Sequence, residues 1–372
     1  MIGDGAAGIM IANKSRLKIP ADRLEVTVIG KSPNHYFKPD GIHIPFGFKD
    51  YRNSVKPNRF LINRGITYLV DEVTSVDIEE RKVLTRGGRT LGYDYLIIAT
   101  GDRYTPEDVP GYESEAKHFY DLEHALELRK HISGFRGGKI VIGRASEPIQ
   151  CPPAPLEISL LLDQYFRSMG MRDKVEMHYL YPIDGTFSIP VVSRLFSGVF
   201  EERGITNHTY FNVERIDAES HKVISYEGET QDYDLLIMLP PHRGQKFLTD
   251  SGLADEYGYV DVDRKMLNYK GHDDVFVIGD ATNLPITKAG SVAHFEADYL
   301  SSRLASELSG SPLPEGYDGT ILCFVEAGME KAVTLYYTHQ SPPRALFTSK
   351  LDHLLKWTST DTYFASMVRG LV

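Results

Sequence analysis

The chain has 372 residues, of which 42% are hydrophobic and 25% are charged, so its composition is that of a globular protein with two or three domains. Its formal net charge of −10 argues against a nucleic acid as the main partner. No apolar run reaches the length of about 18 residues that marks a transmembrane helix, and no secretory signal is evident. We therefore expect a cytoplasmic protein that is soluble or attached to a membrane surface, and the pattern leaves a homo-oligomer open.

The N-terminal segment carries a complete G-x-G-x-x-G motif followed by a pattern typical of a βαβ unit. Residues 6–17 are compatible with a helix, and the apolar run 24–29 predicts a strand. Glycines in such a loop allow a tight turn and a close approach of the backbone to a pyrophosphate at the helix N-terminus. The expected contacts come from Gly3, Gly5, Ala6, Ala7 and Gly8.

Two features of this unit depart from the usual pattern. Only Met1 and Ile2 precede Gly3, which leaves open that the natural chain begins upstream. The acidic residue that usually follows the second strand and binds an adenosine ribose is also missing. We expect Lys31, Ser32 or backbone groups to hold that ribose instead.

A second pair of apolar strands completes a dinucleotide-binding pattern. One strand, within residues 93–101, ends in Thr100 and Gly101, and the other, within residues 274–281, ends in Gly279 and Asp280. Lys288 then precedes a predicted helix over residues 290–308. The positive end of that helix would stabilise negative charge on a bound cofactor.

A second α/β unit lies between these segments. Residues 137–143, 174–180 and 234–239 predict its strands, but the loop after Gly143 lacks the second and third glycines of a nucleotide-binding motif. Glu147 would repel a pyrophosphate there, and Pro148 has no N–H to donate. We therefore expect that no NAD(P)H binds to this unit.

The chain's only cysteines, Cys151 and Cys323, are candidates for redox chemistry. Prolines at 152, 153 and 155 predict an extended, stiff segment around Cys151, followed by a helix over residues 157–166. Glu157 could act as a base toward a thiol, or it could simply favour the helix N-terminus. Both cysteines could instead be buried packing residues. No histidine or cysteine pair has metal-site spacing, so no metal is expected.

These motifs, in this order, resemble the two-dinucleotide-domain flavoprotein disulfide reductases, and the segments around the cysteines resemble the sulfide:quinone oxidoreductase family. Cys151 is followed by prolines, an alanine and Glu157, and Cys323 lies in Leu322-Cys323-Phe324-Val325-Glu326. The resemblance covers essentially the whole chain. It implies FAD as cofactor, with Asp280 on the ribitol, and Cys323 beside the flavin.

The same resemblance implies roles for further residues. His124 lies near a family histidine that handles sulfide, or is an ordinary polar helix residue. Lys356 lies in a His-Leu-x-Lys pattern near the flavin, or is a solvated lysine. Many members carry a third cysteine, which in some binds the flavin covalently. Residues 119–124 contain none, so we expect noncovalent FAD.

The last segment of the chain has an aromatic, basic and amphipathic pattern. Phe364, Met367, Val368 and Leu371 have helical spacing, and Trp357 lies shortly before them. Such an end suits attachment to a bilayer surface and access to a lipid-dissolved quinone, for which Trp357 and Phe364 are candidate contacts. A helix packed on the core or at a subunit contact is the alternative.

We therefore predict an α/β protein with two Rossmann-like units and a small C-terminal region facing membrane and quinone. The predicted domains are 1–105 with 251–310 for FAD, 106–250 for the degenerate second unit, and 311–372 for the C-terminal region. The predicted activity is oxidation of sulfide to polysulfide through a Cys151–Cys323 sulfur bridge and FAD to a quinone, at the cytoplasmic face of the membrane. The alternatives are a type II NADH:quinone dehydrogenase and the flavoprotein subunit of a cytochrome-linked sulfide dehydrogenase.

Overall fold

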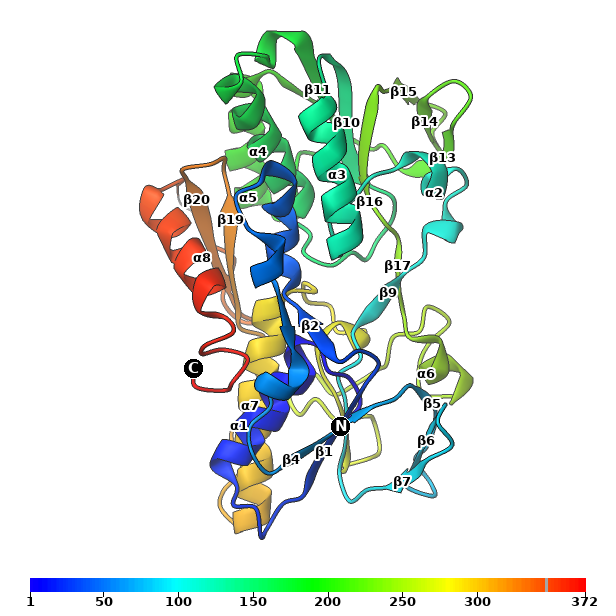
Figure 1. Ribbon diagram of the computed structural model, residues 1–372, viewed down its shortest axis with the longest axis vertical. Coiled ribbons are helices and arrows are strands. Elements are labelled where there is room, and N and C mark those ends of the chain that lie inside the picture. The colour runs from blue at the N-terminus through cyan, green and yellow to red at the C-terminus, as the bar shows by residue number, and fades with distance from the viewer. Residues whose placement is uncertain (345–346) are drawn as a thin grey trace.

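The computed structural model describes residues 1–344 and 347–372, and it contains two α/β units arranged along the long axis of the molecule (Figure 1). The N-terminus lies in one unit, and most of the chain between residues 106 and 250 forms the other. The C-terminal segment lies along one side of both. The expected α/β class is confirmed.

The N-terminal unit is built on a parallel sheet whose strands are β4 (Ile66–Val70), β1 (Val26–Gly30), β8 (Leu96–Ile98) and β18 (Val275–Val277). Ile2 joins the two strand pairs through parallel bridges to Ile29 and Ile98. β8 and β18 are buried at every position, as in strands covered on both faces. Two helices, α1 (Ala6–Lys18) and α7 (Gly290–Ser309), pack against each other beside this sheet.

The second unit has a parallel sheet in the order β12 (Ile205–His208), β11 (Val175–Leu180), β10 (Gly138–Arg144) and β16 (Leu235–Leu239). The helices of this unit are α3 (Leu122–Gly134), α4 (Ala154–Ser168) and α5 (Pro190–Arg203). α4 begins three residues before the start that the sequence predicts. Pro155 is tolerated there because the first-turn N–H groups of a helix have no intrahelical partner.

Each unit also carries a three-stranded antiparallel meander. The strands are β5 (Val73–Asp77), β6 (Lys82–Thr85) and β7 (Thr90–Gly92) in one unit, and β13 (Val213–Asp217), β14 (Lys222–Ser225) and β15 (Thr230–Asp232) in the other. An antiparallel pair, β9 (Asp102–Tyr104) with β17 (His242–Gly244), connects the two units (Figure 1). The remaining short elements are β2 (Asn34–Tyr36), β3 (Val55–Pro57), α2 (Tyr112–Glu115) and α6 (Lys246–Asp250).

The C-terminal segment forms a hairpin of β19 (Ile321–Glu326) and β20 (Ala332–Tyr337), followed by α8 (Lys350–Thr362). β19 contacts α4, α7 and α8, so it brings the C-terminal segment against both units. None of the helices within the described residues is long and apolar enough to cross a membrane.

The predicted apolar helix after Trp357 is wrong in its second half. α8 ends at Thr362, and the following residues form turns in which Val368 is buried. The Asn13 side-chain amide donates to the Val368 carbonyl at 2.7 Å, and Phe364 and Met367 pack on the same cluster. The Asn13 side chain therefore bonds to a backbone carbonyl that would bond within the helix if the helix continued.

Candidate active site

The glycine loop before α1 has the shape that a bound pyrophosphate requires. Gly3 has φ +109°, and a Cβ on it would lie 2.3 Å from the Ala99 carbonyl oxygen. A Cβ on Gly8 would lie 2.0 Å from the Gly3 oxygen, whereas Gly5 has no neighbour within 4 Å of that position. Gly3 and Gly8 therefore allow close packing, and Gly5 leaves the N-terminus of α1 open to an anion.

A cavity of about 650 Å³ extends from this loop to the cysteines. Fourteen of the residues predicted to form the site line it: Gly3, Gly5, Ala6, Ala7, Lys31, Thr100, Gly101, Cys151, Glu157, Gly279, Asp280, Lys288, Cys323 and Lys356. The predicted residues that do not line it are Gly8, Ser32, His124, Trp357 and Phe364. The lining residues extend from α1 to β19, so the cavity suits a dinucleotide rather than a small metabolite.

The loop after β18 supplies the opposite wall of the cavity. The Lys288 amine donates to the carbonyl oxygens of Asp280 at 2.8 Å and Thr282 at 2.9 Å, which fixes the loop that carries Asp280. The Gly279 N–H donates to Glu296 of α7 at 2.6 Å. Burial raises the pKa of Glu296 to about 8, so a proton on this carboxyl is readily kept at neutral pH.

The N-terminus of α7 also faces this cavity. Gly290 and Ser291, the first residues of the helix, line it together with Ala293. No acidic residue lies in the first turn of α7. The unpaired N–H groups of this turn therefore face the cavity without a competing carboxylate from the same turn. These features fit FAD, because the reduced isoalloxazine ring carries negative charge that a helix N-terminus stabilises.

Cys151 and Cys323 line the same cavity, although they are far apart in the sequence. The extended conformation predicted for Cys151 is wrong: it has φ +47°, in the left-handed region, where its N–H donates to the Lys288 carbonyl at 2.7 Å. Cys323 lies in the middle of β19, with its sulfur 3.7 Å from the Ser291 hydroxyl. The Cys151 loop is therefore tied to the loop of Asp280, and Cys323 is held at the start of α7.

Both cysteines are half-buried at the cavity wall, beside groups that disfavour ionisation of their thiols. Burial raises the pKa of Cys323 to about 11. Burial, followed by the negative charges of Glu157 and Cys323, raises the pKa of Cys151 well above its usual range. The Lys356 amine opposes both shifts. A thiolate formed here is consequently a strong electron donor, since nucleophilicity increases with thiol pKa.

Glu157 is 3% exposed and is paired rather than free. Its Oε1 accepts from the Glu326 N–H at 2.7 Å and from the Lys356 amine. Burial alone would lower the pKa of Lys356, but Glu157 and Glu326 outweigh it and raise that pKa above its ordinary value. The pair therefore places a carboxylate and a cation together beside the cysteines.

His124 lies outside the cavity, at the start of α3. Its Nδ1 is 2.7 Å from an Asp121 oxygen, and its ring stacks on His118 with centroids 3.9 Å apart. The side chains of His118, Asp121 and His124 could in principle offer three metal ligands within 4.8 Å, a grouping that the sequence did not predict. Stacked imidazoles direct their lone pairs in parallel rather than at one point, so this geometry favours a capped helix start.

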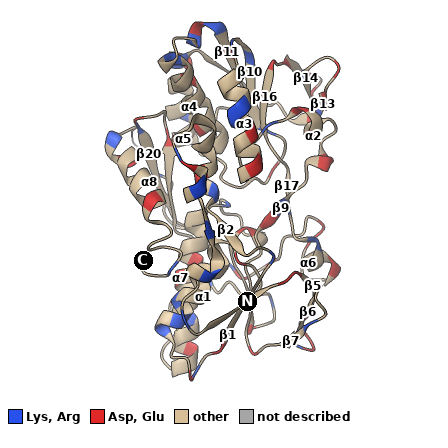
Figure 2. Ribbon diagram, in the orientation of Figure 1, with Lys and Arg blue, Asp and Glu red and all other residues tan. Residues whose placement is uncertain are grey.

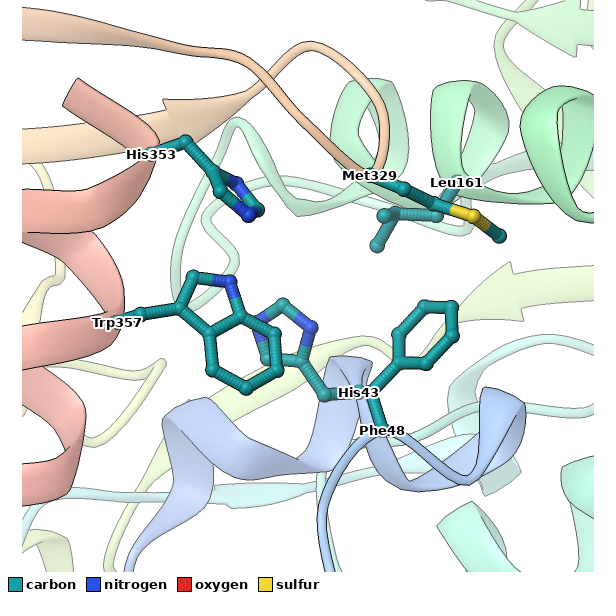
Figure 3. A pocket seen from close by; sticks show the side chains of 6 residues that line it. All are labelled: His43, Phe48, Leu161, Met329, His353 and Trp357. Carbon is teal, nitrogen blue, oxygen red and sulfur yellow. The ribbon is translucent and has the colours of Figure 1, made fainter. Parts of the chain in front are cut away.

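The two candidate quinone contacts occupy different places. Trp357 lines a separate cavity of about 200 Å³ together with His43, Phe48, Leu161, Met329 and His353 (Figure 3). Phe364 lines neither cavity and packs edge-on against Tyr363. The residues of α8 and the turn after it that line the large cavity are Lys356, Ser359, Thr360, Tyr363 and Met367.

Sequence reasoning missed several polar residues of the large cavity. Burial, and then the charge of Asp280, raises the pKa of Asp102 to about 8. The Gln150 side chain donates to Asp102 and accepts from the Lys38 amine at 3.0 Å. Asp102 directly follows the Thr100-Gly101 turn and could have been found from that position, but nothing in the sequence joins Lys38 to Gln150.

The loop after β10 is filled by its own side chains. Arg144 continues the strand, forms an ion pair with Glu147, and lies over the Tyr181 ring at 4.5 Å. Arg144 is buried, so this position offers a packed cation rather than an open glycine backbone. A pyrophosphate bound as in a G-x-G-x-x-G loop would have to displace that pair.

Comparisons with known proteins agree with this fold. Residues 1–143 match the family described as pyridine nucleotide-disulphide oxidoreductase. A mitochondrial sulfide:quinone oxidoreductase of Dictyostelium discoideum is 27% identical over 90% of this chain and 76% of its own length. The solved sulfide:quinone oxidoreductase of Aquifex aeolicus has a TM-score of 0.86 at 24% identity, over 99% of this chain and 90% of that one. A type II NADH:quinone oxidoreductase of Staphylococcus haemolyticus is 22% identical over 83% of this chain and 82% of its own length.

Proposed function

We propose that this chain, a confirmed relative of the sulfide:quinone oxidoreductases over nearly its whole length, oxidises sulfide and passes the electrons to a quinone. The observation that carries the proposal is the presence of Cys151 and Cys323 on the wall of one dinucleotide-sized cavity. No other cysteine is present in the sequence to take either role.

The reaction begins at a sulfur bridge between the two cysteines. HS⁻ attacks the Cys151 sulfur, the bond to the Cys323 sulfur breaks, and Cys323 leaves as a thiolate while Cys151 carries a persulfide. Closure of the bridge as Cys151–S–S–S–Cys323 releases one proton and two electrons. FAD, when bound, supplies the chemistry that takes these electrons and transfers them to the quinone. Repeated cycles lengthen the sulfur chain until it leaves as polysulfide.

The residues around the bridge have separate tasks in this scheme. The Lys356 amine lowers the cost of a thiolate on either cysteine, and Ser291 donates toward the Cys323 sulfur. Glu157 holds Lys356 in place and provides a proton acceptor beside Cys151. The Gly3–Gly8 loop and Asp280 would hold the FAD, without a covalent link.

The outer face of α8 suits contact with a membrane surface, where a quinone is dissolved. Leu351, Leu354 and Leu355 share one side of the helix, and each is exposed. Charged residues are otherwise spread over both units (Figure 2). An exposed apolar stripe on one side of a helix is typical of helices that lie in a bilayer interface. We propose peripheral attachment at the cytoplasmic face through α8.

The rival activity is that of a type II NADH:quinone oxidoreductase, of which relatives also exist. The ion pair of the buried Arg144 with the exposed Glu147 disfavours it, because this loop lacks an open glycine backbone for the nucleotide phosphates. The paired cysteines at the cavity have no task in NADH oxidation.

The visible spectrum of the purified protein tests the proposal. Anaerobic addition of sulfide should bleach the flavin absorbance, and a soluble short-chain quinone should restore it. NADH, added at the same concentration, should leave the spectrum unchanged. Bleaching by NADH but not by sulfide would overturn the proposal and favour the dehydrogenase.

A further inference from the structure

A group of five ionisable side chains spans the space between the large and the small cavity. Glu157 and Lys356 line the large one, whereas His43 and His353 line the small one (Figure 3). Glu326, which is fully buried, contacts members of both pairs. Together they form a polar connection through otherwise apolar packing.

The contacts are continuous from one cavity to the other. His353 Nδ1 is 2.8 Å from Glu326 Oε2, and His43 Nε2 is 3.9 Å from Glu326 Oε1. That same Oε1 is 3.9 Å from the Lys356 amine, which in turn donates to Glu157. The distances of 3.9 Å exceed a hydrogen bond, so a small side-chain movement is needed to join the two halves of the connection.

The charges of the group leave it one proton short of neutrality. Two carboxylates and one amine carry a net negative charge when both histidines are neutral, and buried net charge is costly. Burial raises the pKa of Glu326, while burial and then the positive charge of Lys356 lower that of His43. One added proton, on Glu326, is therefore stabilised by the remaining charge.

The small cavity has the properties of a water site at the end of this group. It has about 200 Å³ of space, and His43 Nδ1 and Trp357 Nε1 have no hydrogen-bond partner among residues 1–344 and 347–372. Buried polar atoms without protein partners are usually satisfied by ordered water. Lys49 lies over the Trp357 ring at 4.4 Å, beside the small cavity.

We propose that His353 and Glu326 carry protons from water in the small cavity to the Glu157–Lys356 pair at the large one. The inference rests on the proposed function and adds a route to it. HS⁻ brings two electrons and one proton, whereas reduction of a quinone to a quinol consumes two electrons and two protons. Each turnover therefore takes one proton from solvent. The carboxylate of Glu326 accepts it from His353 and yields it toward Lys356 and Glu157, which line the large cavity and can pass it to a quinone bound there.

Substitutions at Glu326 and His353 separate this route from the sulfide chemistry. Glu326→Gln keeps the shape of the side chain but cannot carry a proton, so sulfide–quinone turnover should fall by about 10- to 100-fold. Bleaching of the flavin by sulfide alone should persist, because that half-reaction takes no proton from solvent. Glu326→Asp should recover part of the turnover, and Glu330→Gln, in the exposed turn of the same hairpin, is the matched control.

A second variant keeps the test decisive if Glu326→Gln folds poorly. His353→Ala enlarges the small cavity, and added imidazole should restore its quinone turnover in a concentration-dependent way. The solvent deuterium isotope effect on turnover should be larger in both variants than in the unchanged protein. Equal turnover and isotope effects in all variants, or loss of flavin bleaching together with turnover, would overturn the route.

A measurement without turnover addresses the same residues. In the protein without substrate, the infrared carbonyl band of a protonated carboxylic acid should persist to higher pH than for an ordinary glutamate. The Glu326 component of this band should be lost in Glu326→Gln and kept in Glu330→Gln, whereas the components from Glu296 and Asp102, whose pKa values burial also raises, should remain in both. If the Glu326 component is present but sulfide does not bleach the flavin of the unchanged protein, the proposed function is refuted, and the proton route then serves no reaction. Absence of this component from an active protein would refute the route alone.

Discussion

Replacement of Lys356 by Met should destabilise the protein strongly, because it leaves two buried carboxylates without their cation. The side chains of Glu157 and Glu326 are 4% and 0% exposed, and Lys356 is the one amine that contacts both. Removal of one partner of a buried ion pair costs about 3–5 kcal/mol. Urea unfolding followed by circular dichroism, at a fixed FAD concentration, should show a loss of this size at neutral pH.

The loss of stability caused by Lys356→Met should decrease as the pH falls. Burial raises the pKa of Glu326 and the charge of Lys356 opposes that shift, so without Lys356 the folded-state pKa of Glu326 lies further above its unfolded value, and the folded protein binds this proton more tightly than the unfolded chain. The destabilisation is then fully present above the folded pKa and disappears as the pH falls below the unfolded value, about 4.3 for glutamate. Lowering the pH should therefore bring Lys356→Met and the unchanged protein closer together.

Lys350→Met is the matched control, because Lys350 begins the same helix and its contact with Glu330 at 3.4 Å is exposed on both sides. Its effect should stay within about 0.5 kcal/mol. The double variant Glu157→Gln with Lys356→Met should be more stable than Lys356→Met alone, since one of the stranded charges is gone. Equal stability of Lys356→Met and Lys350→Met would refute the assignment of a buried ionic group.

Further outcomes can be checked separately. Acid precipitation should release all FAD into the supernatant, and colour in the pellet would reveal a covalent link. The reduced Cys323 thiol, with its pKa of about 11, has at pH 7 a thiolate fraction about 300-fold smaller than that of a free cysteine of pKa about 8.5. It should therefore react more slowly with iodoacetamide, although the higher nucleophilicity of its thiolate offsets part of this factor, and mass spectrometry of the alkylated peptide measures the rate. A reaction that levels off near pH 8 would contradict the raised pKa. Replacement of Leu351, Leu354 and Leu355 by serine should abolish liposome flotation without loss of bound FAD, and unchanged flotation would exclude α8 as the attachment surface.

The elements of the dinucleotide units could be predicted because their signals are local. The helix from residue 290 follows from its own periodicity and begins at Gly290 as expected. The strands at 174–180 and 234–239 are apolar runs of ordinary strand length, and both lie in the sheet of the second unit. Loop conformation around Gly3 also follows directly from the spacing of its glycines.

The group behind Glu157 could not be predicted in the same way. Glu326 and His353 come from β19 and α8, far from Glu157 in sequence, and only the packing of the hairpin on α4 brings them together. The last turn of the chain was mispredicted for a similar reason. Its apolar spacing fits a helix, but Asn13 of α1 captures its backbone instead. Both cases depend on contacts between distant segments, which local patterns do not encode.

The most direct test of a cysteine-mediated sulfide oxidation is anaerobic stopped-flow mixing of sulfide with the FAD-loaded protein and its Cys151→Ser and Cys323→Ser variants. The flavin absorbance of the unchanged protein should bleach and then recover when quinone is added. Neither variant should reduce quinone with sulfide, because each lacks one end of the sulfur bridge. Full sulfide-dependent quinone reduction by either variant would contradict the mechanism.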